Sequence, residues 1–99
     1  MLKQTPPPSV ERLLAGESVQ SADIVLCTDT DIDRMGKYQQ QWLVVTKDKV
    51  LVASDGQAPQ LLVSVSFADA TEFRCEGVIG SGLLQARING IFCDLLRYS

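Results

Sequence analysis

Asp29, Asp31 and Asp33 place three carboxylates at alternate positions in the first third of the chain. Alternating carboxylates open a calcium-binding loop, in which oxygen atoms surround a hard cation. The rest of that pattern is missing, because Arg34 stands where the loop requires glycine and Gln40 where it requires a bidentate glutamate. The same carboxylates could form a general acid/base pair, but the sequence supplies no apolar pocket to separate their pKa values. We therefore favour a solvated turn between two strands for this acidic run.

Nucleophilic and metal chemistry also lack the residues they need. The chain contains no histidine, which removes the usual general base and the commonest metal ligand. Cys27, Cys75 and Cys93 are far apart and show no C-x-x-C spacing, so we interpret them as small buried apolar side chains rather than metal ligands. The sequence predicts a protein that is not an enzyme, with no catalytic residue, no cofactor and no metal.

A glycine-rich segment at residues 77–82 matches neither phosphate-binding motif. The spacing of Gly77, Gly80 and Gly82 differs from G-x-G-x-x-G, and no lysine follows it. The segment also lies between two predicted strands, whereas both phosphate motifs open a helix. We predict a flexible hairpin loop here.

Length and composition indicate one small globular domain. The chain has 99 residues, 45% of them apolar and 21% charged, enough for one hydrophobic core but not for a separate catalytic domain. Its formal net charge is −3, and its nine basic residues are spread along the chain. This charge pattern argues against nucleic acid and anionic lipid surfaces as partners.

The cysteines and the lack of targeting segments indicate a cytoplasmic location. An odd number of widely spaced cysteines, with no N-terminal signal segment, is typical of reduced thiols in the cytosol. No apolar run approaches the roughly 20 residues of a membrane-spanning helix.

The N-terminal residues divide into a leader and a helix. Residues 1–8 end in three prolines and are predicted to form a flexible extended leader before a single β domain at residues 9–99. Ser9 is placed to cap a short helix, Glu11 lies in its first turn, and Gly16 ends it. Three apolar residues share one face of this helix: Val10, Leu13 and Leu14.

The rest of the chain consists of short β-rich runs separated by turn residues. We predict seven strands: Ala22–Cys27, Gln39–Thr46, Lys49–Ser54, Leu61–Ser66, Thr71–Gly77, Leu83–Ile88 and Ile91–Tyr98. Their regular spacing is typical of an antiparallel sandwich or barrel.

The last two strands form the best-defined hairpin. Asn89-Gly90 is the preferred dipeptide of a two-residue type I′ turn, so Ile88 is expected opposite Ile91. The same register pairs Ala86 with Cys93, Leu84 with Leu95, Arg87 with Phe92, Gln85 with Asp94, and Leu83 with Leu96. One face of the hairpin is then wholly apolar, and a slip of one residue would turn that face outward.

A second hairpin is predicted around Lys47-Asp48, and here both faces are partly apolar. The sequence leaves open whether Trp42 belongs to the core or forms an exposed aromatic spot. An open strand edge, near Trp42 or Tyr98, could accept a partner peptide by strand addition.

Five short segments resemble bacterial pleckstrin-homology-like domains. Residues 36–38 and 42–52, which read Gly-Lys-Tyr and Trp-Leu-Val-Val-Thr-Lys-Asp-Lys-Val-Leu-Val, resemble the opening strands; residues 14–17 with the turn at 31–33, and residues 95–99, fit the same pattern. Together they are similar to the N-terminal domain of certain bacterial ATP-binding-cassette exporters, where such a module precedes the membrane-spanning and ATP-binding domains.

The resemblance implies a seven-stranded barrel that a C-terminal helix normally plugs. The sequence stops before that helix, and Ser99 is a suitable cap for it, so we expect a fragment of a longer chain. The uncovered barrel end would then expose apolar side chains. We expect it either to mediate a homo-oligomer or to be covered by the N-terminal helix.

The predicted function is that of a non-catalytic cytosolic accessory domain of an exporter, which regulates its parent through protein–protein or intramolecular contacts. Its partners would be other domains of the parent in the cell membrane, and ATP would be hydrolysed outside this segment. The alternative is a stand-alone lipid- or peptide-binding module. Lipid headgroups are disfavoured because the first loop carries aspartates where the pleckstrin-type site uses basic residues. An enzyme that uses these aspartates ranks last.

Overall fold

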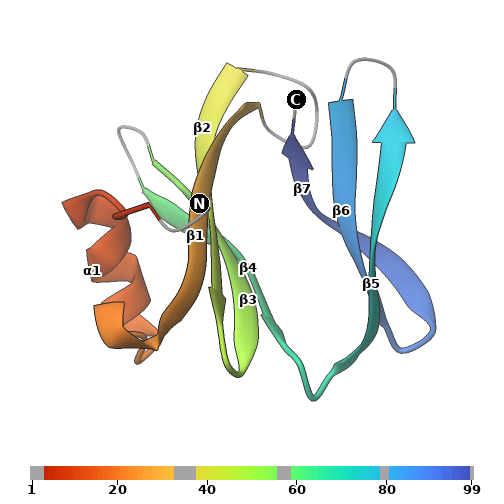
Figure 1. Ribbon diagram of the computed structural model, residues 1–99, viewed down its shortest axis with the longest axis horizontal. Helices are drawn as coiled ribbons and strands as arrows, with labels where there is room; N and C mark the ends of the chain where they lie inside the picture. The colour runs from red at the N-terminus through yellow and green to blue at the C-terminus, as the bar shows by residue number, and fades with distance from the viewer. Residues whose placement is uncertain (1–3, 33–37, 56–58, 79–80, 99) are drawn as a thin grey trace.

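The computed structural model describes residues 4–32, 38–55, 59–78 and 81–98. Within these ranges the elements are α1 (Pro8–Gly16), a 3-10 turn η1 (Ser21–Asp23), β1 (Ile24–Ile32), β2 (Tyr38–Thr46), β3 (Lys49–Ser54), β4 (Gln60–Ser66), β5 (Ala70–Val78), β6 (Ser81–Ile88) and β7 (Ile91–Tyr98) (Figure 1). A mainly β chain with seven antiparallel strands and one short N-terminal helix is confirmed.

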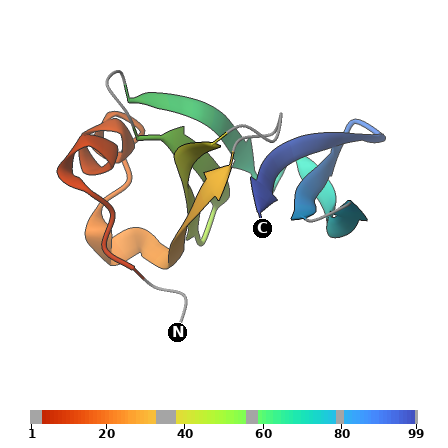
Figure 2. The ribbon, with the colours of Figure 1, turned by 90° about the horizontal axis from the view of Figure 1, so that it is seen from above.

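The strands form two antiparallel sheets. One has the order β1-β2-β3-β4 and the other β5-β6-β7, so each strand pairs with its neighbours in sequence. The sheets diverge between β4 and β5 and approach each other at β1 and β7, where the Thr30 hydroxyl donates to the Arg97 carbonyl at 3.1 Å (Figures 1 and 2). No strand pairing joins the two sheets over the described ranges, so they do not close into a barrel.

Helix α1 begins two residues earlier than predicted, at Pro8 rather than at Val10. Pro8 occupies the start of the helix, where a missing N–H costs no hydrogen bond, and the preceding Pro7 makes no side-chain cap. Ser9 therefore lies inside the helix rather than capping it, and its hydroxyl donates to Asp55 Oδ1 at 2.8 Å. The predicted end at Gly16 is confirmed.

The leader before α1 lies along the first sheet. The Gln4 backbone N–H donates to the Cys27 carbonyl at 2.8 Å, and Pro6 is buried. These contacts hold the described part of the leader against β1; residues 1–3 lie outside the described ranges.

The first sheet buries both of its faces, which is why β3 is buried at successive positions. Helix α1 and the second sheet lie on opposite sides of the first sheet (Figure 2). Because side chains alternate along a strand, Leu51 and Ala53 belong to the core with α1, whereas Val50 and Val52 belong to the core with the second sheet. A helix–sheet core therefore lies on one side of the first sheet: Val10, Leu14, Val19, Ile24, Cys27, Trp42, Val44, Leu51 and Ala53. An intersheet core lies on the other: Val50, Val52, Val65, Ala86, Leu95 and Leu96.

This arrangement answers two questions that the sequence left open, the position of Trp42 and the surface that α1 covers. Trp42 is a core residue, 7% exposed, rather than a surface spot. Helix α1 covers the outer face of the first sheet, so the expectation that it covers an open end between the sheets is wrong. Its apolar face matches the β1–β3 surface on the side away from the second sheet (Figure 1).

The β6–β7 hairpin has the predicted turn and most of the predicted register. Asn89 and Gly90 both have positive φ, 53° and 82°, and Ile88 pairs with Ile91. The pairs of Ala86, Arg87 and Gln85 are also as predicted. Beyond them an irregularity on β7 shifts the ladder by one residue, so that Leu84 pairs with Leu96 and Leu83 with Arg97, contrary to prediction. The shift turns the side chains of both Leu95 and Leu96 into the intersheet core.

Gly90→Ala is expected to lower the free energy of unfolding by about 1–2 kcal/mol, because an L side chain clashes with its own backbone at positive φ. Gly16→Ala is the matched control, since Gly16 has an ordinary φ and open space where the added methyl group would lie, and it is expected to be neutral or slightly stabilising. Urea unfolding of both variants measures the difference. Equal losses at the two positions would contradict the role of the turn.

Candidate functional site

The described part of the acidic run, Asp29 and Asp31, lies on strand β1 rather than in a turn. Asp29 pairs with Trp42 on β2, and its Oδ2 atom accepts a hydrogen bond from Gln40 Nε2 at 3.0 Å. Asp31 belongs to the same strand, and Asp33 lies outside the described residues. The turn prediction is wrong because threonine and isoleucine alternate with the aspartates and favour an extended strand paired with β2. The carboxylate that is described serves a cross-strand contact.

The three thiols occupy two environments. Cys27 is fully buried in the helix–sheet core, and burial, with a smaller contribution from Asp29, raises the pKa of its thiol. It therefore stays protonated and is unsuited to act as a nucleophile. Cys75 and Cys93 are exposed, so the prediction that all three are buried is wrong for these two. The described residues contain no group of three histidine, cysteine or acidic side chains that could hold a metal ion.

The glycine-rich segment contributes to two strands. Gly77 of β5 pairs with Gly82 of β6, and Val78 pairs with Ser81, so residues 79 and 80, which lie outside the described ranges, are left between the two strands. On the other side of Gly82, Tyr98 of β7 places its ring where a side chain of residue 82 would be, within 2.7 Å of the Cβ position. The Tyr98 hydroxyl also meets Cys75 in a hydrogen bond that raises the pKa of the phenol. The glycines therefore make room for an aromatic ring and not for a phosphate.

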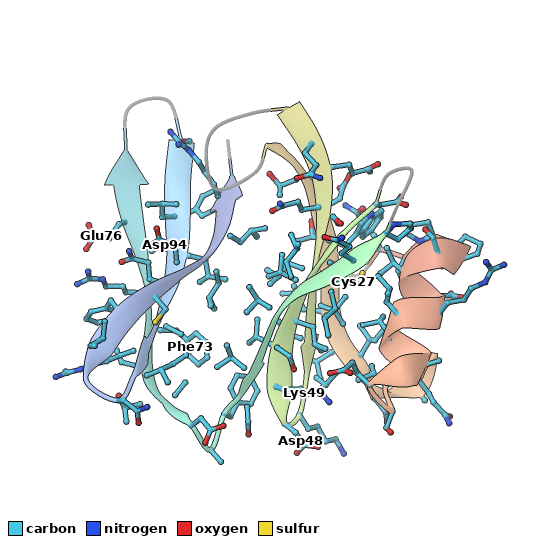
Figure 3. All side chains as sticks on the ribbon, turned by 180° about the vertical axis from the view of Figure 1, so that it is seen from behind. Cys27, Asp48, Lys49, Phe73, Glu76 and Asp94 are labelled. Atoms are coloured by element: carbon cyan, nitrogen blue, oxygen red, sulfur yellow. The ribbon has the colours of Figure 1, made fainter. Side chains whose placement is uncertain are left out.

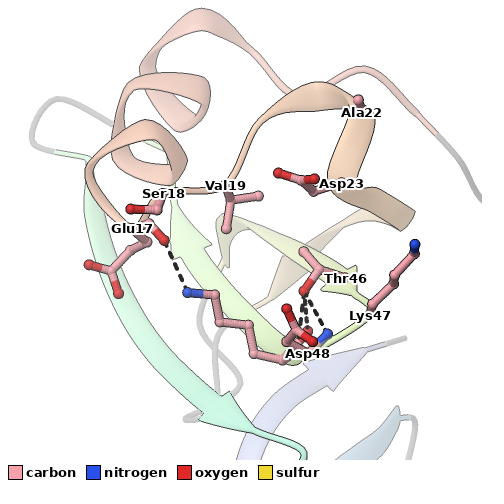
Figure 4. Close-up of a pocket in the computed structure, with 9 residues that line it drawn as sticks. Glu17, Ser18, Val19, Ala22, Asp23, Thr46, Lys47 and Asp48 are labelled. Atoms are coloured by element: carbon pink, nitrogen blue, oxygen red, sulfur yellow. Dashed lines mark hydrogen bonds between the residues drawn. The ribbon is translucent and has the colours of Figure 1, made fainter.

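A hollow of about 430 Å³ lies between the end of α1, η1 and the β2–β3 turn (Figure 4). The Lys49 side chain crosses it, and Lys49 Nζ donates to the Glu17 carbonyl at 3.0 Å. Thr46 Oγ1 accepts hydrogen bonds from the backbone N–H groups of Asp48 and Lys49, at 3.2 Å each. These bonds fasten the β2–β3 turn to the helix end. The lining mixes acidic and basic side chains without a nucleophile and a base in contact, so we assign it a structural role.

The outer face of the second sheet, which points away from the first sheet, carries an ordered row of polar contacts. Arg74 Nε donates to Gln85 Oε1 at 2.8 Å, and Gln85 Nε2 donates to Asp94 Oδ1 at 2.6 Å, so the row crosses all three strands. Arg74 Nε also lies 3.4 Å from Glu76 Oε1. The Arg74 guanidinium stacks 3.6 Å from the centre of the Phe92 ring, which fixes its direction.

Strand β5 forms one edge of this sheet, and it is the most exposed element of the described chain. Residues 71–77 are all exposed, and Phe73, 37% exposed, meets Phe67 edge-to-face with ring centres 5.6 Å apart (Figure 3). The sequence predicted an open strand edge near Trp42 or Tyr98. Strand β5 is an edge strand that no other described strand pairs on its outer side, and Tyr98 reaches it through Cys75, whereas Trp42 lies in the other sheet. We take β5 and the outer face beside it as the candidate interaction surface.

No helix among the described residues is long and apolar enough to cross a membrane. Comparisons of the chain with family models, with curated proteins and with solved structures found no match.

Proposed function

We propose that this chain is a non-catalytic accessory domain that acts through protein–protein contacts. The observation that carries the proposal is strand β5, an exposed edge beside an outer face whose charged side chains are already held in place. Preorganised side chains lose little entropy when a partner binds. The buried thiol of Cys27 and the structural use of Asp29 and Lys49 give no support to an enzymatic alternative.

The finer proposal is a pleckstrin-homology-like domain at the N-terminus of a bacterial ATP-binding-cassette exporter, in the cytoplasm beside its membrane-bound parent. A four-stranded and a three-stranded antiparallel meander are compatible with that fold. The sequence beyond Ser99 tests the assignment. A helix-forming segment, membrane spans and ATP-binding motifs downstream would support it, whereas a stop codon directly after Ser99 would contradict it.

A stand-alone peptide-binding module of the same fold is the second candidate, because the β5 edge offers backbone groups to an added strand. Titration of the isolated domain with peptides from the parent exporter, against peptides of scrambled order, separates the two candidates. Binding only to parent sequences favours the accessory domain. Lipid binding has less support, since Asp29 occupies β1 where a headgroup site would need basic side chains.

A further inference from the structure

The β6–β7 turn fixes the direction of the backbone groups in the second sheet. Ile88 and Ile91 flank a two-residue turn and so form a hydrogen-bonded pair. Successive residues of a strand direct their N–H and C=O groups to opposite sides, so Arg87 and Gln85 direct theirs away from β7 and toward β5. The Thr71 hydroxyl of β5 donates to the Arg87 carbonyl at 3.4 Å, which is consistent with that carbonyl pointing toward β5.

The same alternation identifies the backbone N–H and C=O groups of β5 that point away from β6. Glu72 and Arg74 lie opposite Arg87 and Gln85 and use their backbone groups within the sheet. The alternate residues direct their N–H and C=O groups to the open edge: Phe73, Cys75 and Gly77.

Strand β5 lacks several of the features by which proteins protect a sheet edge, and those it has are three charged side chains of alternating sign and a bulge at its start. It contains no proline or lysine, and the side chains on the face toward the first sheet, Phe73 and Cys75, are uncharged. Its irregularity lies at the start, between Ala70 and Glu72, and the ladder is regular from Glu72 onward. The regular part can therefore pair with another strand.

The sequence of this strand is complementary to itself in one antiparallel register. Pairing centred on Cys75 keeps the free backbone groups in hydrogen-bonded pairs, and it sets Arg74 across from Glu76 of a second copy, twice by symmetry. It also sets Phe73 across from Gly77 of the second copy. Among the described residues, no atom lies within 4 Å of a Cβ position at Gly77, so the space above it can take an aromatic ring.

The competing register, centred on Phe73, is less favourable. It also pairs opposite charges, Glu72 with Arg74, but it extends across the irregularity at Ala70 and leaves the space above Gly77 unfilled. The register on Cys75 lies wholly within the regular part of the strand.

We propose that two copies of the chain associate by antiparallel pairing of their β5 strands, centred on Cys75, to form one continuous six-stranded sheet. This interface is a strand edge and not an uncovered barrel end, and it does not depend on the exporter assignment. One strand pair buries little area, so the dimer is weak and is populated at chain concentrations on the order of 0.1–1 mM.

Cross-linking with a short bismaleimide locates the interface. Cys75 and Cys93 are both exposed, on β5 and on β7, while the buried Cys27 is protected from the reagent. A variant that keeps Cys75 (Cys93→Ser) is expected to cross-link rapidly, and its matched control that keeps Cys93 (Cys75→Ser) is not. Equal rates, or faster cross-linking through Cys93, would overturn the proposal.

Charge reversal tests the register by sedimentation equilibrium. Glu76→Arg sets arginine against Arg74 at two pairs and is expected to weaken the dimer about tenfold. Glu72→Arg changes net charge equally on the same face but has no charge across from it, so it is expected to change the dissociation constant less than about twofold. The double variant Arg74→Glu/Glu76→Arg is expected to restore dimerisation.

Circular dichroism verifies that each variant is folded before it is compared. If Glu72→Arg weakened the dimer more than Glu76→Arg, the register centred on Cys75 would be overturned. A monomer at every concentration up to about 1 mM would overturn self-pairing and leave the β5 edge to a peptide of another protein.

Discussion

Trp42→Ala is expected to lower the free energy of unfolding by about 3–5 kcal/mol. The indole is 7% exposed and packs in the helix–sheet core, so its removal leaves a large cavity between α1 and the first sheet. The surrounding backbone belongs to three paired strands and cannot collapse to fill the cavity. Urea unfolding followed by far-UV circular dichroism measures the loss, because the variant has no tryptophan fluorescence.

Trp42→Phe separates packing from polarity at the same position. The indole Nε1 atom is buried without a hydrogen-bond partner among the described residues. Phenylalanine removes this unsatisfied donor, and the gain offsets part of the stability lost by the smaller ring. We therefore expect Trp42→Phe to lower the free energy of unfolding by about 1 kcal/mol. Val25→Ala, at a side chain 61% exposed on β1, is the surface control and should change stability by less than about 0.5 kcal/mol. Equal losses for Trp42→Ala and Val25→Ala would contradict the helix–sheet core.

The hairpin at Asn89-Gly90 could be predicted from the sequence because two independent signals agree there. The dipeptide selects a turn with positive φ, and apolar alternation selects the register. The register shift near Leu95 could not be predicted, because an extra residue in one strand leaves no mark in an apolar run. Leu95 and Leu96 are both apolar, and only the packed core reveals that both are buried.

Trp42 shows why the orientation of the first sheet was undecided. Strands β2 and β3 are apolar on both faces, and the sequence cannot distinguish a sheet covered twice from one covered once. Here α1 covers one face and the second sheet the other. The prediction of a turn at the acidic run was wrong because tertiary context overrides local preference. Aspartates favour turns locally, but pairing with β2 extends β1 to Ile32.

The candidate interaction surface depends on strand order, which periodicity does not encode. Glu72, Arg74 and Glu76 read as an ordinary solvated face, and nothing in their spacing indicates an edge. Their significance appears only once β6 is placed between β5 and β7, which leaves β5 with one side that no described strand pairs.

Leu14→Ala is expected to cost about 2–5 kcal/mol by loosening α1 from the first sheet. Leu14 is 2% exposed and belongs to the helix–sheet core together with Val10. Alanine has the highest helix propensity, so any loss of stability measures packing between α1 and the sheet and not the helix itself. Arg12→Ala, on the exposed face of the same helix, is the matched control and should change stability by less than about 0.5 kcal/mol.

The fluorescence of Trp42 distinguishes local loosening from general unfolding in this variant. Because α1 covers Trp42 but not the intersheet core, loosening of the helix should move the emission to longer wavelength while the amide signals of Ala86 and Leu96 keep their native positions. Unchanged emission together with a full loss of stability would mean that the two cores unfold as one unit. Loosening confined to α1 would mean that the two sheets, and with them the β5 edge, hold their arrangement without the helix.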